Sequence, residues 1–103
     1  EAVAARGFHV AGAFMVPLHD KLVQQKLRCR GAAPADAVAG RHRCLMVSKA
    51  LASMPWAAVD MWPASRRRPP ASAEALSRLL SRAAAAAPKA TKVELWMVCG
   101  ADL

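Results

Sequence analysis

The chain lacks any apolar run of about 18 residues, the length that a membrane-spanning helix needs, and this absence excludes a transmembrane segment. Its three cysteines, Cys29, Cys44 and Cys99, are odd in number and contain no CxxC pair, so neither a disulfide framework nor a zinc site is indicated. Acidic residues are few: seven stand against fifteen Lys plus Arg, for a formal charge of +8. We therefore expect an intracellular protein in a reducing compartment, with no membrane partner and a surface that attracts anions.

Hydrophobic residues make up 55% of the chain, which excludes a disordered tail, and 103 residues allow one domain at most. No internal repeat is visible. The basic residues form one true cluster, Arg66-Arg67-Arg68, flanked by Pro63, Pro69 and Pro70. This pattern favours a solvated loop, with a contact to phosphate or nucleic acid as the alternative.

Three short apolar runs predict buried strands at residues 8–16, 56–62 and 93–98. A helix is predicted from about Asp36 to Ser53, with Asp36 near the start complementing the helix dipole. Its apolar stripe recurs at helical spacing and consists of Cys44, Val47, Leu51 and Met54. Ser72 is a good N-cap for a second helix that ends at Pro88. The buried face of this helix is predicted to consist of Leu76, Leu79, Leu80, Ala83 and Ala87. Residues 21–34 are polar and basic and predict a loop or a short helical turn.

The predicted order is therefore β-α-β-α-β. Strands that read as continuous apolar runs and alternate with helices predict an α/β fold with a three-stranded parallel sheet and crossover helices. In such sheets a ligand lies beyond the carboxyl ends of the strands. The last predicted strand runs directly into Cys99-Gly100-Ala101-Asp102-Leu103. Gly100 would let a ligand approach the backbone, and Asp102 would accept hydrogen bonds from sugar hydroxyls.

Three other features invite a functional interpretation, and each also has a structural one. His19-Asp20 beside a strand end suggests an acid/base dyad, although a loop histidine with satisfied hydrogen bonds is favoured. The three tryptophans are expected to pack in the core rather than to stack on bases. Cys99 is expected to be a buried residue at a strand end rather than a reactive thiol.

Taken together, these stretches resemble the eukaryotic-type nicotinamide/nicotinic acid mononucleotide adenylyltransferases. The landmarks of this resemblance span most of the chain and keep their order, and nearly their spacing, up to Leu76. They are, in chain order, FHVAG at 8–12, VPLHD at 16–20, His42-Arg43 with Met46, WAAVDMW at 56–62, Ser72 with Leu76, and CGADL at 99–103.

The resemblance implies a Rossmann-like nucleotidyltransferase fold. Its activity would join a pyridine mononucleotide to the adenylyl group of ATP, giving NAD or deamido-NAD and pyrophosphate, with Mg²⁺ as the cofactor. Such catalysis relies on positioning and charge stabilisation, without a covalent intermediate. The partners implied are ATP and the mononucleotide, with no nucleic acid; homo-oligomerisation is left open.

The family's ATP-handling segments, Gly-x-Phe-x-Pro-x-x-x-x-His and Ser-x-Thr-x-x-Arg, have no counterpart here. Because they are missing, and because residues 1–103 begin at Glu1 and stop at CGADL, we expect an internal fragment of one partial nucleotidyltransferase domain, inactive by itself.

By the same resemblance, Gly100 and Asp102 match the family's dinucleotide-contacting residues. Ser72 matches a Thr at the pyridine end of the ligand, with a plain N-cap as the alternative. Gln24 stands where a Lys would reach a phosphate, and no catalytic residue falls within the chain.

Departures from the family pattern occur at Leu22, Gln24, Pro63 and Pro69, the last of these replacing a ring that would stack on the pyridine. They leave two alternatives open, namely a degenerate homologue that binds nucleotide without transfer, and a basic nucleic-acid-binding module.

Overall fold

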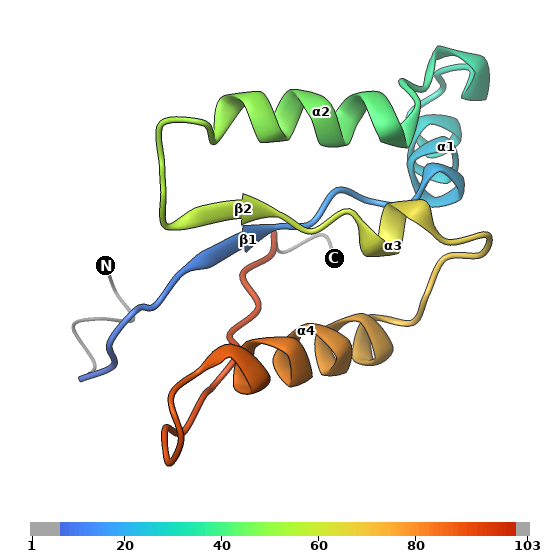
Figure 1. The fold of residues 1–103 in the computed structure, drawn as a ribbon. Helices are drawn as coiled ribbons and strands as arrows, with labels where there is room; N and C mark the ends of the chain where they lie inside the picture. Colours follow the sequence, from blue (N-terminus) through green and yellow to red (C-terminus); the bar gives the residue numbers. More distant parts are fainter. Residues whose placement is uncertain (1–6, 101–103) are drawn as a thin grey trace. The chain divides into compact units, whose positions relative to one another are not determined.

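The computed structural model describes residues 7–100, and the chain divides into two compact units, Glu1–Pro69 and Pro70–Leu103 (Figure 1). The first unit contains, in order, β1 (Ala13–Met15), α1 (Asp20–Cys29), the 3-10 helix η2 (Pro34–Asp36), α2 (Gly40–Ala50), β2 (Ala57–Val59) and α3 (Trp62–Ser65). The second unit contains α4 (Ser72–Ala86) and the segment that follows it. The predicted α/β class is confirmed.

The two strands of the first unit pair in parallel, as predicted for the first and second apolar runs. Each strand is three residues long, and all three residues of β1 are exposed, so the prediction of a buried strand at residues 8–16 is wrong. Phe14 lies opposite Ala58 at the centre of the register. The ladder is extended at both ends, because the Ala13 amide donates to the Trp56 carbonyl at 2.9 Å and the Asp60 amide donates to the Met15 carbonyl at 2.8 Å. Two parallel neighbours need a crossover between them, and here α1, η2 and α2 provide it.

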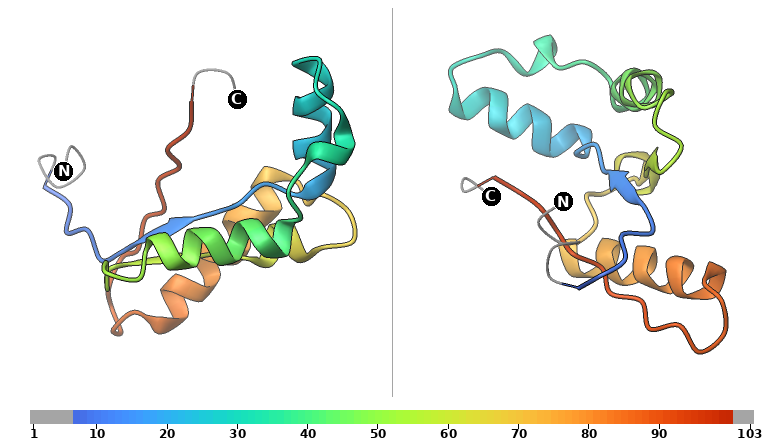
Figure 2. Two further views of the ribbon diagram at one scale, coloured as in Figure 1. Left: turned by 90° about the horizontal axis from the view of Figure 1, so that it is seen from above. Right: turned by 90° about the vertical axis from the view of Figure 1, so that its left-hand side faces the viewer.

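The third predicted strand is not formed, so the prediction of a three-stranded sheet is wrong. Residues 91–100 carry neither strand nor helix (Figure 2), and the sheet of the described residues has two strands. Val93 and Leu95 are half-buried while Glu94 and Trp96 are exposed. The segment therefore has the alternation of a strand without the neighbour whose hydrogen bonds would make it one. Cys99, expected to be buried at a strand end, is exposed.

Helix α1 occupies ten residues where a loop or a short helical turn was predicted. Asp20 lies in its first turn, and Lys26 and Arg28 lie in its last turn. This is the charge order that the helix dipole favours. Leu22 and Leu27 are half-buried. Because most residues of this segment are polar, its narrow apolar side did not produce a helical pattern strong enough to predict the helix.

Helix α2 begins four residues later than predicted, at Gly40, and packs against β2 and α3 (Figures 1 and 2). Asp36 lies in η2 and not in the first turn of α2, so its predicted role at that helix dipole is wrong. Of the predicted apolar stripe, Cys44 is buried and Val47 and Leu51 are half-buried, whereas Met54 is exposed and lies beyond the last residue of the helix, Ala50.

Helix α4 agrees closely with the prediction, except at its cap. Leu79 is buried, and the other predicted positions of its apolar face, Leu76, Leu80, Ala83 and Ala87, are half-buried. The N-cap, however, is Ala71, which makes no side-chain cap hydrogen bond, and Ser72 is the first helical residue. The prediction of Ser72 as the N-cap is therefore wrong by one position.

Burial is sparse in the described part of the chain. The buried hydrophobic residues there are Cys44 and Leu79, and the buried polar residue is His19. Trp56 and Trp96 are exposed, so the expectation that the tryptophans pack in the core is wrong for these two. Among residues 7–100, no helix combines the length and apolar character needed to cross a bilayer.

The three thiols are predicted to differ sharply in their accessibility to a thiol reagent. Cys29 and Cys99 are exposed, whereas Cys44 is 3% exposed. In the native chain we expect two thiols to react at once and the third to react only on unfolding. The C29S/C99S variant, which keeps Cys44 alone, should react slowly in buffer and fast in denaturant. Fast reaction of this variant in buffer would contradict the packing of α2.

Candidate functional site

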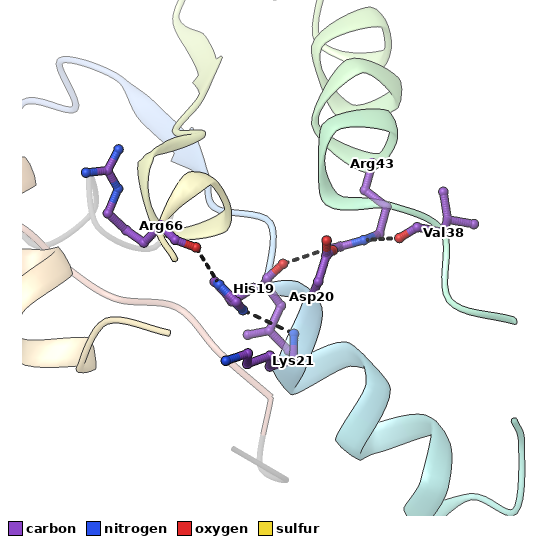
Figure 3. A network of polar contacts seen from close by, with 7 residues as sticks. His19, Asp20, Lys21, Val38, Arg43 and Arg66 are labelled. Carbon is purple, nitrogen blue, oxygen red and sulfur yellow. Dashed lines mark hydrogen bonds and ion pairs between the residues drawn. The ribbon is translucent and has the colours of Figure 1, made fainter. Parts of the chain in front are cut away.

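Polar side chains gather where α1 begins, beside α2 and the residues after α3 (Figure 3). His19 is the N-cap of α1, and its Nδ1 atom accepts a hydrogen bond from the Lys21 amide at 3.1 Å. The first amides of a helix have no partner inside the helix, so a side-chain acceptor at the N-cap stabilises its start. His19 is 6% exposed and therefore forms this bond away from solvent.

The second ring nitrogen of His19 connects α1 to the segment after α3. Nε2 lies 2.7 Å from the carbonyl oxygen of Arg66. Because the Lys21 amide is a donor, Nδ1 must be unprotonated. Nε2 therefore carries the proton and donates it to the Arg66 carbonyl. Both ring nitrogens are engaged, and the favoured prediction of a satisfied histidine is confirmed.

Arg43 of α2 makes a three-way contact with the segments around it. Its Nη2 atom lies 2.5 Å from Asp20 Oδ1, its Nη1 donates to the Leu18 carbonyl at 2.8 Å, and its Nε donates to the Val38 carbonyl at 2.9 Å. The planar guanidinium suits such a contact, since its donors are held in a rigid fork. Arg43 therefore joins the end of β1, the start of α1 and the start of α2.

Gly40 leaves the space that this ion pair occupies. A Cβ atom at position 40 would lie 2.9 Å from Asp20 Oδ1 and 3.3 Å from Arg43 Nη2. The first of these separations is shorter than atoms tolerate, so any side chain at position 40 would displace the Asp20 carboxylate.

The segment that receives the His19 bond is organised by short-range contacts. The Trp62 amide donates to Asp60 Oδ1 at 3.2 Å, and the Ser65 hydroxyl donates to the Trp62 carbonyl at 2.8 Å. The Arg66 guanidinium lies over the Trp62 ring, 5.1 Å from its centroid, which is a cation–π distance. Arg66, Arg67 and Arg68 are exposed, as expected for a solvated loop.

The predicted ligand-binding residues do not share one unit. Gln24 lies in α1 of the first unit and is half-buried. Ser72 and Gly100 belong to the second unit, where both are exposed. Asp102 falls outside the described residues.

The alternative interpretation of His19-Asp20 as an acid/base dyad is wrong. The carboxylate of Asp20 bonds to Arg43, and the His19 ring bonds to Lys21 and Arg66. Sequence reasoning placed Arg43 in a landmark of the resemblance but missed its contact with Asp20. Its partner Asp20 is 23 residues away, and a lone Asp and a lone Arg at that separation carry no periodic signal.

The described residues do not present a ready-made metal site. Within positions 7–100, no group of three or more His, Cys, Asp or Glu side chains comes together. The expected Mg²⁺ is an ion that commonly binds through substrate phosphates and water, with only one or two carboxylates.

Comparison with protein-family models, curated proteins and solved structures found no match for this chain.

Replacing Gly40 with Ala is predicted to have opposite effects in two backgrounds. In the native chain the new methyl group should displace Asp20 and lower the free energy of unfolding by about 1 kcal/mol. In a D20A background the shorter of the two contacts is gone and the Arg43 side chain is released from its ion pair, so the higher helix propensity of Ala should raise stability by about 0.5 kcal/mol. Urea unfolding followed by circular dichroism measures both effects. If G40A changes the free energy of unfolding in the same direction in both backgrounds, Gly40 does not act by leaving space for the Asp20 carboxylate.

Two substitutions of His19 are predicted to separate its two hydrogen bonds. H19A removes both and should cost about 2 kcal/mol, whereas H19N keeps an N-cap acceptor and should cost about half as much. Hydrogen exchange at the Lys21 amide should speed up in H19A and stay slow in H19N. In the native chain, ring ¹⁵N shifts should show a protonated Nε2. Equal loss of protection in both variants would argue against the cap.

Proposed function

We propose that this chain is part of a Rossmann-like nucleotidyltransferase that joins nicotinamide or nicotinic acid mononucleotide to the adenylyl group of ATP. In this reaction a phosphate oxygen of the mononucleotide bonds to the α-phosphorus of ATP. The bond between the α-phosphorus and the bridging oxygen breaks, and pyrophosphate leaves. The products are NAD or deamido-NAD and pyrophosphate. The chain alone lacks the segments expected to handle ATP and is proposed to be inactive.

The observation that carries the proposal is the ion pair between Asp20 and Arg43. These residues belong to two separate landmarks of the resemblance, VPLHD at 16–20 and the His42-Arg43 pair. Arg43 also bonds to the Leu18 carbonyl within the first of them. A chance similarity of scattered motifs has no reason to bring two of them into direct contact, so the contact supports a common architecture.

A third landmark of the resemblance, residues 56–62, is connected to the same group of contacts around the start of α1. Residues 56–62 contain β2, which pairs in parallel with β1. Within that landmark Asp60 accepts the Trp62 amide and so forms the turn that leads to Arg66 and its bond with His19. The pairing of two parallel strands through a helical crossover is the local unit of Rossmann-like folds. This unit supports the proposal at the level of architecture.

Four residues are proposed to contact the ligand. Gly100 would allow close approach of the backbone, and Asp102 would accept hydrogen bonds from a ribose hydroxyl. Ser72 would lie at the pyridine end. Gln24 would donate a neutral hydrogen bond where the family pattern has a Lys for a phosphate.

A second candidate is a homologue that binds nucleotide without transferring the adenylyl group. It is favoured by Gln24, because a neutral, half-buried side chain supplies no charge to a phosphate. Lys21 and Lys26 on the same helix are exposed, and either one could supply this charge from a shifted position. The two candidates differ in product formation and not in ligand binding.

The decisive assay uses a protein in which this chain is part of a complete nucleotidyltransferase domain. With ATP, Mg²⁺ and either mononucleotide, it should release pyrophosphate, while the 103-residue chain alone should release none. Binding of mononucleotide without pyrophosphate release would favour the second candidate. Neither binding nor release with both mononucleotides would remove the proposal.

In the same assay, D102N should raise KM for the mononucleotide by roughly 10- to 100-fold, the value of a lost hydrogen bond to a charged group. R82Q, an exposed position on α4, is the matched control and should leave KM unchanged. An unchanged KM in D102N would show that Asp102 does not contact the sugar.

A further inference from the structure

The positive charge of the chain is concentrated in one of its two units. Residues 1–69 contain eleven Lys and Arg against four acids, for a net +7, and residues 70–103 contain four against three, for a net +1. A parallel pair of strands and its helices need no such excess for folding, and the proposed reaction would use only a few cations. The excess therefore calls for a separate explanation.

Much of this charge is exposed and not neutralised by carboxylates. We call residues 66–68 the arginine loop. Within residues 7–100, Arg67 and Arg68 have no ion-pair partner, and all three arginines of this loop are exposed. The nearest acid along α1, Asp20, is engaged by Arg43. The arginines lie between Pro63 and Pro69-Pro70, whose fixed φ angles reduce the freedom that the loop would lose on binding.

His19 joins the backbone of the arginine loop to the backbone at the start of α1. The Nδ1 atom of its ring accepts a hydrogen bond from the Lys21 amide, and the Nε2 atom donates one to the Arg66 carbonyl (Figure 3). Lys21 is therefore held next to the loop. Along α1, Lys21, Gln25 and Arg28 follow at helical spacing and are all exposed. We call Lys21, Arg28 and Arg66–Arg68 the basic surface.

The spread of the basic surface indicates the kind of anion that fits it. Lys21 and Arg28 are seven residues apart on α1, which corresponds to about 10 Å along the helix. That length covers about three phosphates of one nucleic-acid strand at 3.4 Å of rise each. A single phosphate would contact only a fraction of such a row. The Trp62 ring is covered by Arg66, so base stacking on that face is blocked.

We propose that the basic surface binds the phosphate backbone of nucleic acid without base preference. This activity would be separate from the proposed transfer reaction and does not depend on it. The forked donors of Arg67 and Arg68 suit phosphate oxygens. Binding of this kind is electrostatic, and it weakens steeply as salt rises because each neutralised phosphate releases counterions.

The test titrates the 103-residue chain into a fluorescently labelled DNA duplex of arbitrary sequence, between about 50 mM and about 200 mM salt. We expect the affinity to fall steeply with salt. R67Q/R68Q should reduce the slope of log K against log salt by about 2 and weaken binding by roughly 10- to 100-fold at 0.1 M salt. K21Q/R28Q should have a similar effect. Circular dichroism checks that both variants stay folded.

The matched control is R82Q/K89Q, which removes the same charge from exposed positions of the second unit. It should bind the duplex nearly as well as the native chain. If this control weakens binding as much as R67Q/R68Q does, the overall positive charge of the chain explains the binding, and the proposed surface is overturned. Absence of duplex binding near 0.1 M salt overturns the proposal. So does binding to phosphatidylserine vesicles in place of the duplex.

Discussion

The guanidinium of Arg43 is the interaction on which the first unit depends. It reaches a carboxylate at the start of α1, a carbonyl at the exit of β1 and a carbonyl just before α2. The described residues bury little apolar surface, so the usual hydrophobic constraint on helix position is weak here. A charged fork that contacts three segments at once compensates for this, and it does so only because Gly40 leaves room for the Asp20 carboxylate.

His19 extends the same arrangement to the loop that follows α3. One imidazole fixes the first turn of α1 and, through its other nitrogen, the backbone at Arg66. Arg43 therefore connects α1 to α2 and to the end of β1, whereas His19 connects α1 to the arginine loop. Both connections use residues within the first two positions of α1 or at its cap.

The two proposals rest on different parts of this arrangement. The transferase proposal uses the contacts among landmark motifs that are far apart along the chain, with Asp20 and Arg43 as the direct link. The nucleic-acid proposal uses exposed cations on two segments whose backbones His19 joins, at Lys21 and at Arg66. Because Arg67 and Arg68 take no part in the contacts that hold the unit together, the second proposal can fail without affecting the first.

The sequence alone determined the α/β class, the parallel pairing of the first two apolar runs, the apolar face of α4 and the exposure of the arginine loop. Each of these follows from local periodicity or composition. The tertiary structure decided what depends on partners distant in the chain. Val93–Val98 has the pattern of a strand but no pairing neighbour, α1 is a helix whose start is capped by His19, and Asp20 pairs with Arg43 rather than with its sequence neighbour His19. Periodicity records which side of an element is apolar, whereas hydrogen bonds and ion pairs require a particular partner in space, and a single sequence does not name that partner.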